Sequence, residues 1–136
     1  MDGRDSGGGG TRAALTIAEA AATTGWSARM LRYVEDAGLV ASRRSASGYR
    51  LYGPEELQRL RTLRELLERF GIALSDMGFA RRLHHDEALR AAVDEWLAAS
   101  PRRPTHVDPA DWLRWEQDKH ERLLATVSAN SEEKTR

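Results

Sequence analysis

The 136-residue sequence contains no cysteine. This absence excludes disulfide bonds, thiolate metal sites and cysteine-based redox switches. The sequence also has no apolar run near the roughly 18–20 residues that a membrane-spanning helix needs. Its first residues, MDGRDSGGGGTR, lack the apolar segment of a secretory signal. We therefore expect a cytoplasmic protein with no membrane partner.

The sequence also has no excess of positive or negative charge, because its formal net charge at pH 7 is zero. The charges are nevertheless distributed unevenly: residues 11–85 carry a net charge of +4 and residues 86–136 a net charge of −3. A basic half beside an acidic half is typical of a nucleic-acid-binding part joined to a different one. Of the 21 basic residues, 19 are arginine, whose planar donors suit phosphate and guanine.

Two short helices are predicted near the start of the chain, after a Gly-rich tail over residues 1–14. Thr16 and Glu19 form a capping-box pattern for the first helix, and Gly25 is a left-handed terminator. Ser27 is the expected N-cap of the second helix, whose buried side contains Met30, Leu31 and Val34. Two helices joined by a turn that contains glycine predict a helix-turn-helix.

A small β-hairpin, or wing, is predicted directly after these helices. Gly38 ends the second helix, and residues 43–52 alternate around a Ser/Gly turn, with Tyr49 and Leu51 on one side and Arg50 and Tyr52 on the other. Pro54 then begins a long third helix that Gly71 ends, and a weaker fourth helix is expected from about Leu74 to Leu83.

The remaining sequence predicts two more helices and a second tail. Residues 86–99 form a short amphipathic pattern, and two prolines within residues 100–104 interrupt any helix. Asp108 and Pro109 then begin a helix that reaches about Ala129, followed by a flexible tail over residues 130–136. The fold class is therefore mainly α: a winged helix-turn-helix with a short β-hairpin wing, followed by a two-helix C-terminal region.

Residues 15–83 resemble the DNA-binding domain of the MerR family of bacterial transcription regulators. The resemblance rests on LRYVEDAGL and SGYRLY, which occur in the family's order and spacing. It implies a homodimer that binds near-palindromic promoter DNA, distorts it between the promoter hexamers, and acts beside RNA polymerase on the nucleoid. We expect no cofactor. The region over residues 86–129 resembles no effector domain, and we expect it to serve dimerisation or to form a small effector lobe.

The resemblance also assigns DNA contacts residue by residue. The second helix would enter the major groove, with Ser27, Arg29 and Arg32 facing bases or phosphates and Tyr33 contacting the backbone. Positions on the wing that grip phosphates or the minor groove are occupied by Arg43, Arg44, Tyr49 and Arg50. The alternative for Arg29 and Arg32 is a place on a solvated helix face. The alternative for Tyr33 is a place at the edge of the core. Tyr52 is expected in the core.

The chain departs from the family's pattern at several positions. Val34 replaces a tyrosine, which removes a backbone contact, and Trp26 replaces a small aliphatic residue in the turn. Ala73 stands where a Ser or Thr often caps the fourth helix, and Gly78 weakens that helix. The long helix that pairs the subunits does not follow directly. Instead, residues 109–128 carry an apolar stripe that Glu116, Lys119 and His120 interrupt, and we expect this helix either to pair with its twin or to pack on residues 86–99.

Other chemistry finds little support in the sequence. The four histidines have no spacing that suits one metal ion, and no nucleophile–base–orienter set is recognisable, so we expect neither a metal site nor an enzyme. Trp96, Trp112 and Trp115 suit core or dimer packing better than a ligand pocket. Two rival functions remain: an architectural DNA-organising protein that binds many sites, and an interaction adaptor that no longer reads DNA.

Overall fold

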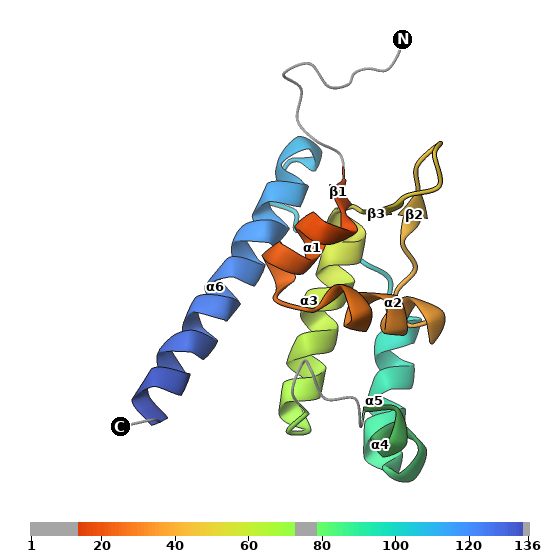
Figure 1. Ribbon diagram of the computed structural model, residues 1–136, viewed down its shortest axis with the longest axis vertical. Helices are drawn as coiled ribbons and strands as arrows, with labels where there is room; N and C mark the ends of the chain where they lie inside the picture. The colour runs from red at the N-terminus through yellow and green to blue at the C-terminus, as the bar shows by residue number, and fades with distance from the viewer. Residues whose placement is uncertain (1–13, 73–78, 135–136) are drawn as a thin grey trace.

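The computed structural model describes residues 14–72 and 79–134, with side chains up to residue 125 apart from residue 80. It is mainly helical, as the sequence predicts, and Figure 1 shows the helices arranged around the long helix α3 (Pro54–Arg69). No helix in this part of the chain is long and apolar enough to cross a membrane.

The helix-turn-helix consists of α1 (Ile17–Thr24) and α2 (Ala28–Asp36). Both predicted N-caps are confirmed: the Thr16 hydroxyl accepts from the Glu19 amide at 3.2 Å, and the Ser27 hydroxyl accepts from the Met30 amide at 3.0 Å. Gly25 ends α1 with a φ of 81°, the left-handed conformation that glycine adopts without strain. The turn is closed by Trp26, which is fully buried in the core.

The wing is part of a three-stranded antiparallel sheet, one strand more than the sequence predicts. Strands β2 (Arg43–Arg44) and β3 (Arg50–Tyr52) form the expected hairpin. The additional strand β1 (Leu15–Thr16) pairs with the other edge of β3, where Leu15 lies opposite Tyr52. Leu15 and Tyr52 are both buried, so the sheet anchors the wing in the core and confirms the expected place of Tyr52.

The C-terminal helices pack on the same core as the helix-turn-helix. Helix α4 (Phe79–His85) and α5 (Glu87–Ala98) follow α3, and α5 contacts both α3 and α4. The part of the fourth helix expected before Phe79, with Ala73 and Gly78, lies outside the described residues. A 3₁₀ turn (Pro109–Asp111) then leads into α6 (Trp112–Lys134), which extends beyond Ala129.

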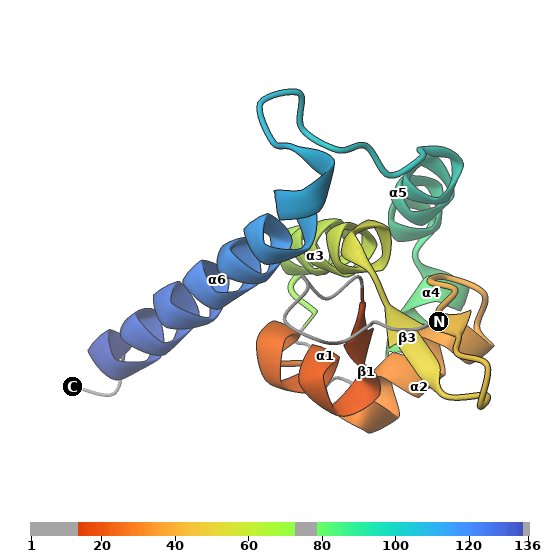
Figure 2. The same ribbon diagram turned by 90° about the horizontal axis from the view of Figure 1, so that it is seen from above.

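Helix α6 packs on α1 and α3 and has no contact with α5 among the described residues, so the alternative in which it packs on residues 86–99 is wrong. Figure 2 shows α6 on one side of α3, and it shows α2 and the wing on the other side of α3. The C-terminal end of α6 projects away from the other helices in both views.

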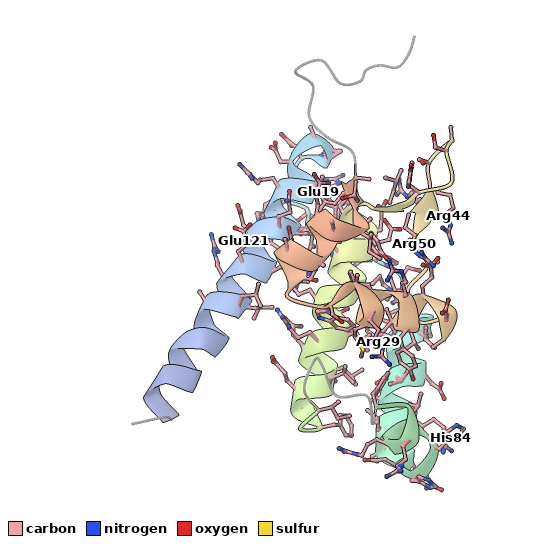
Figure 3. The ribbon with its side chains drawn as sticks, viewed as in Figure 1. Glu19, Arg29, Arg44, Arg50, His84 and Glu121 are labelled. Atoms are coloured by element: carbon pink, nitrogen blue, oxygen red, sulfur yellow. The ribbon has the colours of Figure 1, made fainter. Side chains whose placement is uncertain are left out.

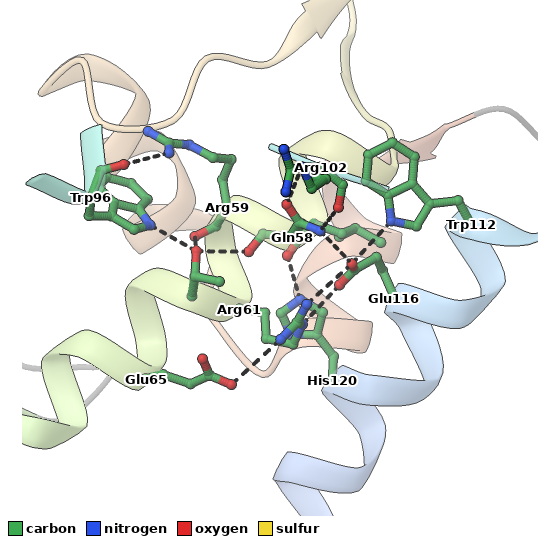
Figure 4. A network of polar contacts seen from close by, with 11 residues as sticks. Gln58, Arg59, Arg61, Glu65, Trp96, Arg102, Trp112, Glu116 and His120 are labelled. Carbon is green, nitrogen blue, oxygen red and sulfur yellow. Dashed lines mark hydrogen bonds and ion pairs between the residues drawn. The ribbon is translucent and has the colours of Figure 1, made fainter. Parts of the chain in front are cut away.

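A buried polar layer joins α6 to α3 (Figure 4). The Glu116 side chain is fully buried and accepts from Arg61 Nε at 2.9 Å, from Trp112 Nε1 at 3.1 Å and from Gln58 Nε2 at 3.3 Å. One turn further along α6, the fully buried His120 donates from Nε2 to the Leu57 carbonyl at 2.8 Å. Two of the three polar residues that interrupt the apolar stripe of this helix, Glu116 and His120, are therefore among its main contacts with α3.

Helix α6 also comes close to the turn between α1 and α2. A Cβ atom at Gly25 would lie 2.4 Å from Leu124 Cδ2, so the turn and α6 are in direct contact. Beside this contact, the buried Arg64 of α3 donates from Nη2 to the Thr24 carbonyl at 2.6 Å. The first contact attaches α6 to the helix-turn-helix, and the second attaches α3 to it.

We predict that His120 makes the protein less stable in mild acid. Burial lowers the pKa of His120 to about 4, and the positive charge of Arg64 contributes, against the hydrogen bond to Leu57. The unfolded chain has an ordinary histidine pKa of about 6.5, so between these values the unfolded state binds a proton that the folded state does not. The free energy of unfolding should fall as the pH drops through this window, by at most about 3 kcal/mol from this residue.

Thermal melts at several pH values between 7 and 4 measure this loss. The His120→Gln variant keeps a donor for the Leu57 carbonyl and does not titrate, so its melting temperature should depend less on pH. Equal pH dependence in both proteins would contradict the prediction.

Candidate nucleic-acid interface

Helix α2 presents arginines on the face opposite its buried side. Met30, Leu31 and Val34 are buried, and their spacing leaves Arg29 and Arg32 exposed on the outer face. Neither arginine forms a hydrogen bond or ion pair with another residue in the described part of the chain. Their guanidinium groups are therefore available to an external anion or base edge.

Tyr33 lies at the border between this outer face and the core. Its ring is half-buried and packs edge-on against Phe79, with ring centroids 6.4 Å apart. Burial raises the pKa of Tyr33, so its hydroxyl stays protonated at neutral pH and remains a hydrogen-bond donor. The ring thus packs at the edge of the core, and a contact between the Tyr33 hydroxyl and a DNA backbone stays a prediction.

The wing extends from the same side of the molecule as α2. Its turn is closed by the Gly48 amide, which donates to the Ser45 carbonyl at 2.9 Å, and Gly48 has a φ of 88°. Tyr49, the next residue, is 71% exposed and is one of the few large apolar side chains on the surface. Figure 3 shows Arg29, Arg44 and Arg50 on the side of the domain away from α6.

Each wing arginine is paired with a carboxylate of its own chain. Arg43 contacts Glu55 of α3 at 2.8 Å, and Arg50 contacts Glu35 of α2 at 2.5 Å. Arg44 lies 3.6 Å from the same Glu35. The side chains of Arg43 and Arg44 remain about half exposed, whereas that of Arg50 is 24% exposed. The predicted wing arginines therefore differ, because Arg50 is also a structural link between the wing and α2.

Glu35 is charged in this arrangement. Partial burial alone would raise the pKa of Glu35, but hydrogen bonds from Arg50 and Ser42 and the charges of Arg50 and Arg44 outweigh it and hold the pKa below its ordinary value. The Ser42 hydroxyl donates to the second carboxylate oxygen at 3.0 Å. Glu35 was not predicted from the sequence as a functional residue. Its two arginine partners are distant in sequence, and only the acidic residue itself, inside the motif LRYVEDAGL, marks the position.

Arg29 of α2 lies on the same side of the domain as Arg44 and Arg50 of the wing, and we call the predicted contact residues of these two elements the α2–wing surface. Ser27 lies at its edge, with the hydroxyl oxygen occupied by the N-cap bond and the hydroxyl proton available to a ligand. The members of this surface are Ser27, Arg29, Arg32, Tyr33, Arg43, Arg44, Tyr49 and Arg50.

The other candidate sites do not form an alternative centre in the part of the chain that the structure describes. No group of three or more His, Asp or Glu residues is arranged there to hold a metal ion. Trp96 donates from Nε1 to the Thr62 hydroxyl at 2.8 Å and lies against the Arg59 guanidinium, 3.9 Å from the ring centroid. Trp112 is buried and bonded to Glu116. These two tryptophans therefore serve packing within the chain.

Comparison with known proteins supports one interpretation of this surface. Residues 15–77 match the model of the MerR HTH family regulatory proteins. No curated protein and no solved structure matches the chain. The matched segment contains α1, α2, the wing and α3, and therefore every member of the α2–wing surface.

We predict that two substitutions of Ser27 separate its roles in stability and in ligand binding. Ser27→Ala removes the N-cap and should cost about 1 kcal/mol of stability. Ser27→Asp keeps an acceptor for the Met30 amide and suits the positive end of the helix, so the melting temperature should stay close to that of the wild type. The aspartate nevertheless adds a negative charge beside Arg29, which should weaken binding to duplex DNA. Full DNA affinity in Ser27→Asp would remove Ser27 from the interface.

Proposed function

We propose that this chain, whose residues 15–77 form a MerR-type helix-turn-helix domain, binds near-palindromic promoter DNA as a homodimer and regulates transcription there. The family match supports the broader statement that it is a DNA-binding transcription regulator. Promoter recognition and the dimer go beyond that match. In this proposal residues 15–83 are the DNA-binding domain, and the helical region over residues 86–129 carries dimerisation.

The unpaired state of Arg29 and Arg32 is the observation that carries the proposal. Two exposed guanidinium groups lie one turn apart on α2, the second helix of a helix-turn-helix, and no described carboxylate neutralises either of them. In this motif the second helix enters the major groove, where arginine recognises guanine through two parallel hydrogen bonds. Arg29 and Arg32 would therefore provide base or phosphate contacts, with the Tyr33 hydroxyl donating to the backbone.

The wing would contribute contacts to phosphates. Arg43 and Arg44 are about half exposed even in their ion pairs, so each has donors directed to solvent. The exposed ring of Tyr49 lies next to them on the hairpin and would pack against a sugar or the minor groove. Phosphate contacts of this kind provide affinity and orientation but little sequence selection.

A dimer agrees with the recognition of two DNA half-sites and with the projecting end of α6. One recognition helix reads too few base pairs for a unique site, and a two-fold pair reads two half-sites. The first half of α6 is occupied by its own chain, because Leu113, Glu116 and His120 are buried against the domain. The end of α6 that projects from the domain would therefore pair with its twin (Figure 1). Such a dimer would work on the nucleoid in the cytoplasm, beside RNA polymerase.

We predict that the double variant Arg29→Ala, Arg32→Ala loses DNA binding without losing its fold. Each arginine contact should be worth about 1–3 kcal/mol of binding free energy. The measurement is fluorescence anisotropy on a duplex that the wild-type protein selects from a random-sequence library. Both side chains are exposed, so the melting temperature should stay unchanged.

Arg114→Ala is the control for the loss of an exposed positive charge outside α2 and the wing. Arg114 is exposed on α6, on the other side of α3 from α2, and its loss should leave the affinity nearly unchanged. The assignment of the recognition helix would be wrong if the double variant bound the selected duplex as tightly as this control does.

We predict that the projecting end of α6 pairs two chains. A truncation after Ala125 retains every residue of α6 that is described as buried, so the domain should stay folded. Sedimentation should show a dimer for the full chain and a monomer for the truncation. A dimer in both would place the interface elsewhere on the molecule. A monomer in both would mean that the chains pair only on DNA.

A further inference from the structure

We propose that Glu35 is a specificity-determining residue, which holds the wing in register with the recognition helix and penalises DNA that pulls its arginines away. This inference rests on the proposed function, because it concerns how the α2–wing surface distinguishes one duplex from another. Glu35 would not itself contact DNA. It would act through Arg44 and Arg50.

The geometry of Glu35 is that of a link between two DNA-contacting elements. One carboxylate oxygen pairs with Arg50 of β3 at 2.5 Å, and the other accepts from Ser42 at 3.0 Å and lies 3.6 Å from Arg44 of β2. The carboxylate thus contacts both strands of the hairpin and the segment that leads into it. Within the described residues, no other side chain of α2 has a hydrogen bond or ion pair to the wing.

Burial makes this link sensitive to the loss of either partner. The Glu35 side chain is only 17% exposed and that of Arg50 24%. A carboxylate in such a place is stable when its partners are present and unfavourable when they leave, because water does not fully replace them. By contrast, the pair between Arg43 and Glu55 lies at the surface, with side chains 53% and 38% exposed, and its exchange for a phosphate costs little.

This difference has a consequence for DNA binding. A phosphate that attracts Arg44 or Arg50 out of its pair leaves Glu35 uncompensated beside the negative duplex. A duplex is therefore bound well only if its phosphates meet Arg43 and the outer donors of Arg44 while Glu35 keeps its partners. Binding that ignores sequence depends mainly on the net positive charge near the phosphates, and Glu35 lowers that charge. One residue thus weakens binding to arbitrary DNA and favours duplexes that match the held geometry.

Two substitutions of Glu35 test its charge and its side-chain length separately. Glu35→Gln keeps the size and an acceptor oxygen but removes the charge. Glu35→Asp keeps the charge and shortens the side chain, so that it no longer holds both arginines. Asp36→Asn is the control, because it removes the same charge from the neighbouring position of α2, where Asp36 is exposed and forms no hydrogen bond or ion pair with a described residue.

The measurement is the ratio of affinities for two duplexes at several salt concentrations. One duplex is selected by the wild-type protein from a random-sequence library, and the other is a scrambled duplex of equal length and composition. Glu35→Gln should bind the scrambled duplex several-fold more tightly and with a steeper salt dependence, and the ratio should fall roughly tenfold, as after the loss of one well-placed contact. Glu35→Asp should bind the scrambled duplex as the wild type does and the selected duplex more weakly. Asp36→Asn should strengthen both and leave the ratio unchanged.

The outcomes distinguish the inference from the function on which it rests. If the wild type selects no duplex from the library, the proposed function is wrong and the inference with it. If the wild type discriminates and both Glu35 variants keep its ratio, the inference alone is overturned. Melting curves establish whether each variant is folded at the assay temperature. If Glu35→Gln is not folded, the comparison of Glu35→Asp with the wild type decides the matter.

Discussion

The buried ion pair between Glu116 and Arg61 determines how the rest of this protein is arranged. A carboxylate without exposed surface is stable only where its hydrogen-bonding partners surround it, so the pair fixes which face of α6 meets α3. With that face fixed, Leu124 meets the turn at Gly25, and the helix-turn-helix is attached to α6. The remaining length of α6 is the part that we propose to pair with a second chain.

The α2–wing surface depends on a second, smaller set of charges on the opposite side of α3. Arg29 and Arg32 are unpaired in the described structure, whereas the wing arginines are held by Glu35 and Glu55. Helix α2 therefore offers free donors, and the wing offers donors that a ligand must share with the protein. In the proposed function, the regulator would obtain its affinity from both elements and its discrimination from the position of one relative to the other.

Local signals made much of this fold predictable, and long-range pairings did not. The caps at Thr16 and Ser27 depend on residues three positions apart, and both are confirmed. Strand β1 was missed because its two residues pair with β3, 35 or more positions away. Glu116 and His120 were interpreted as interruptions of an apolar stripe because their partners lie on α3. For the same reason Glu35 was missed, since its contacts with Arg44 and Arg50 appear only when the hairpin register is known.

A genome-wide map of the sites that the protein occupies in its host tests the central claim most directly. The account predicts a small number of sharply defined sites at promoters, with a two-fold repeated sequence whose half-sites are about one helical turn apart. These sites should disappear in the double variant of Arg29 and Arg32. Broad coverage without a common sequence would contradict the claim and identify a DNA-organising protein instead. Absence of any bound DNA would indicate an interaction adaptor.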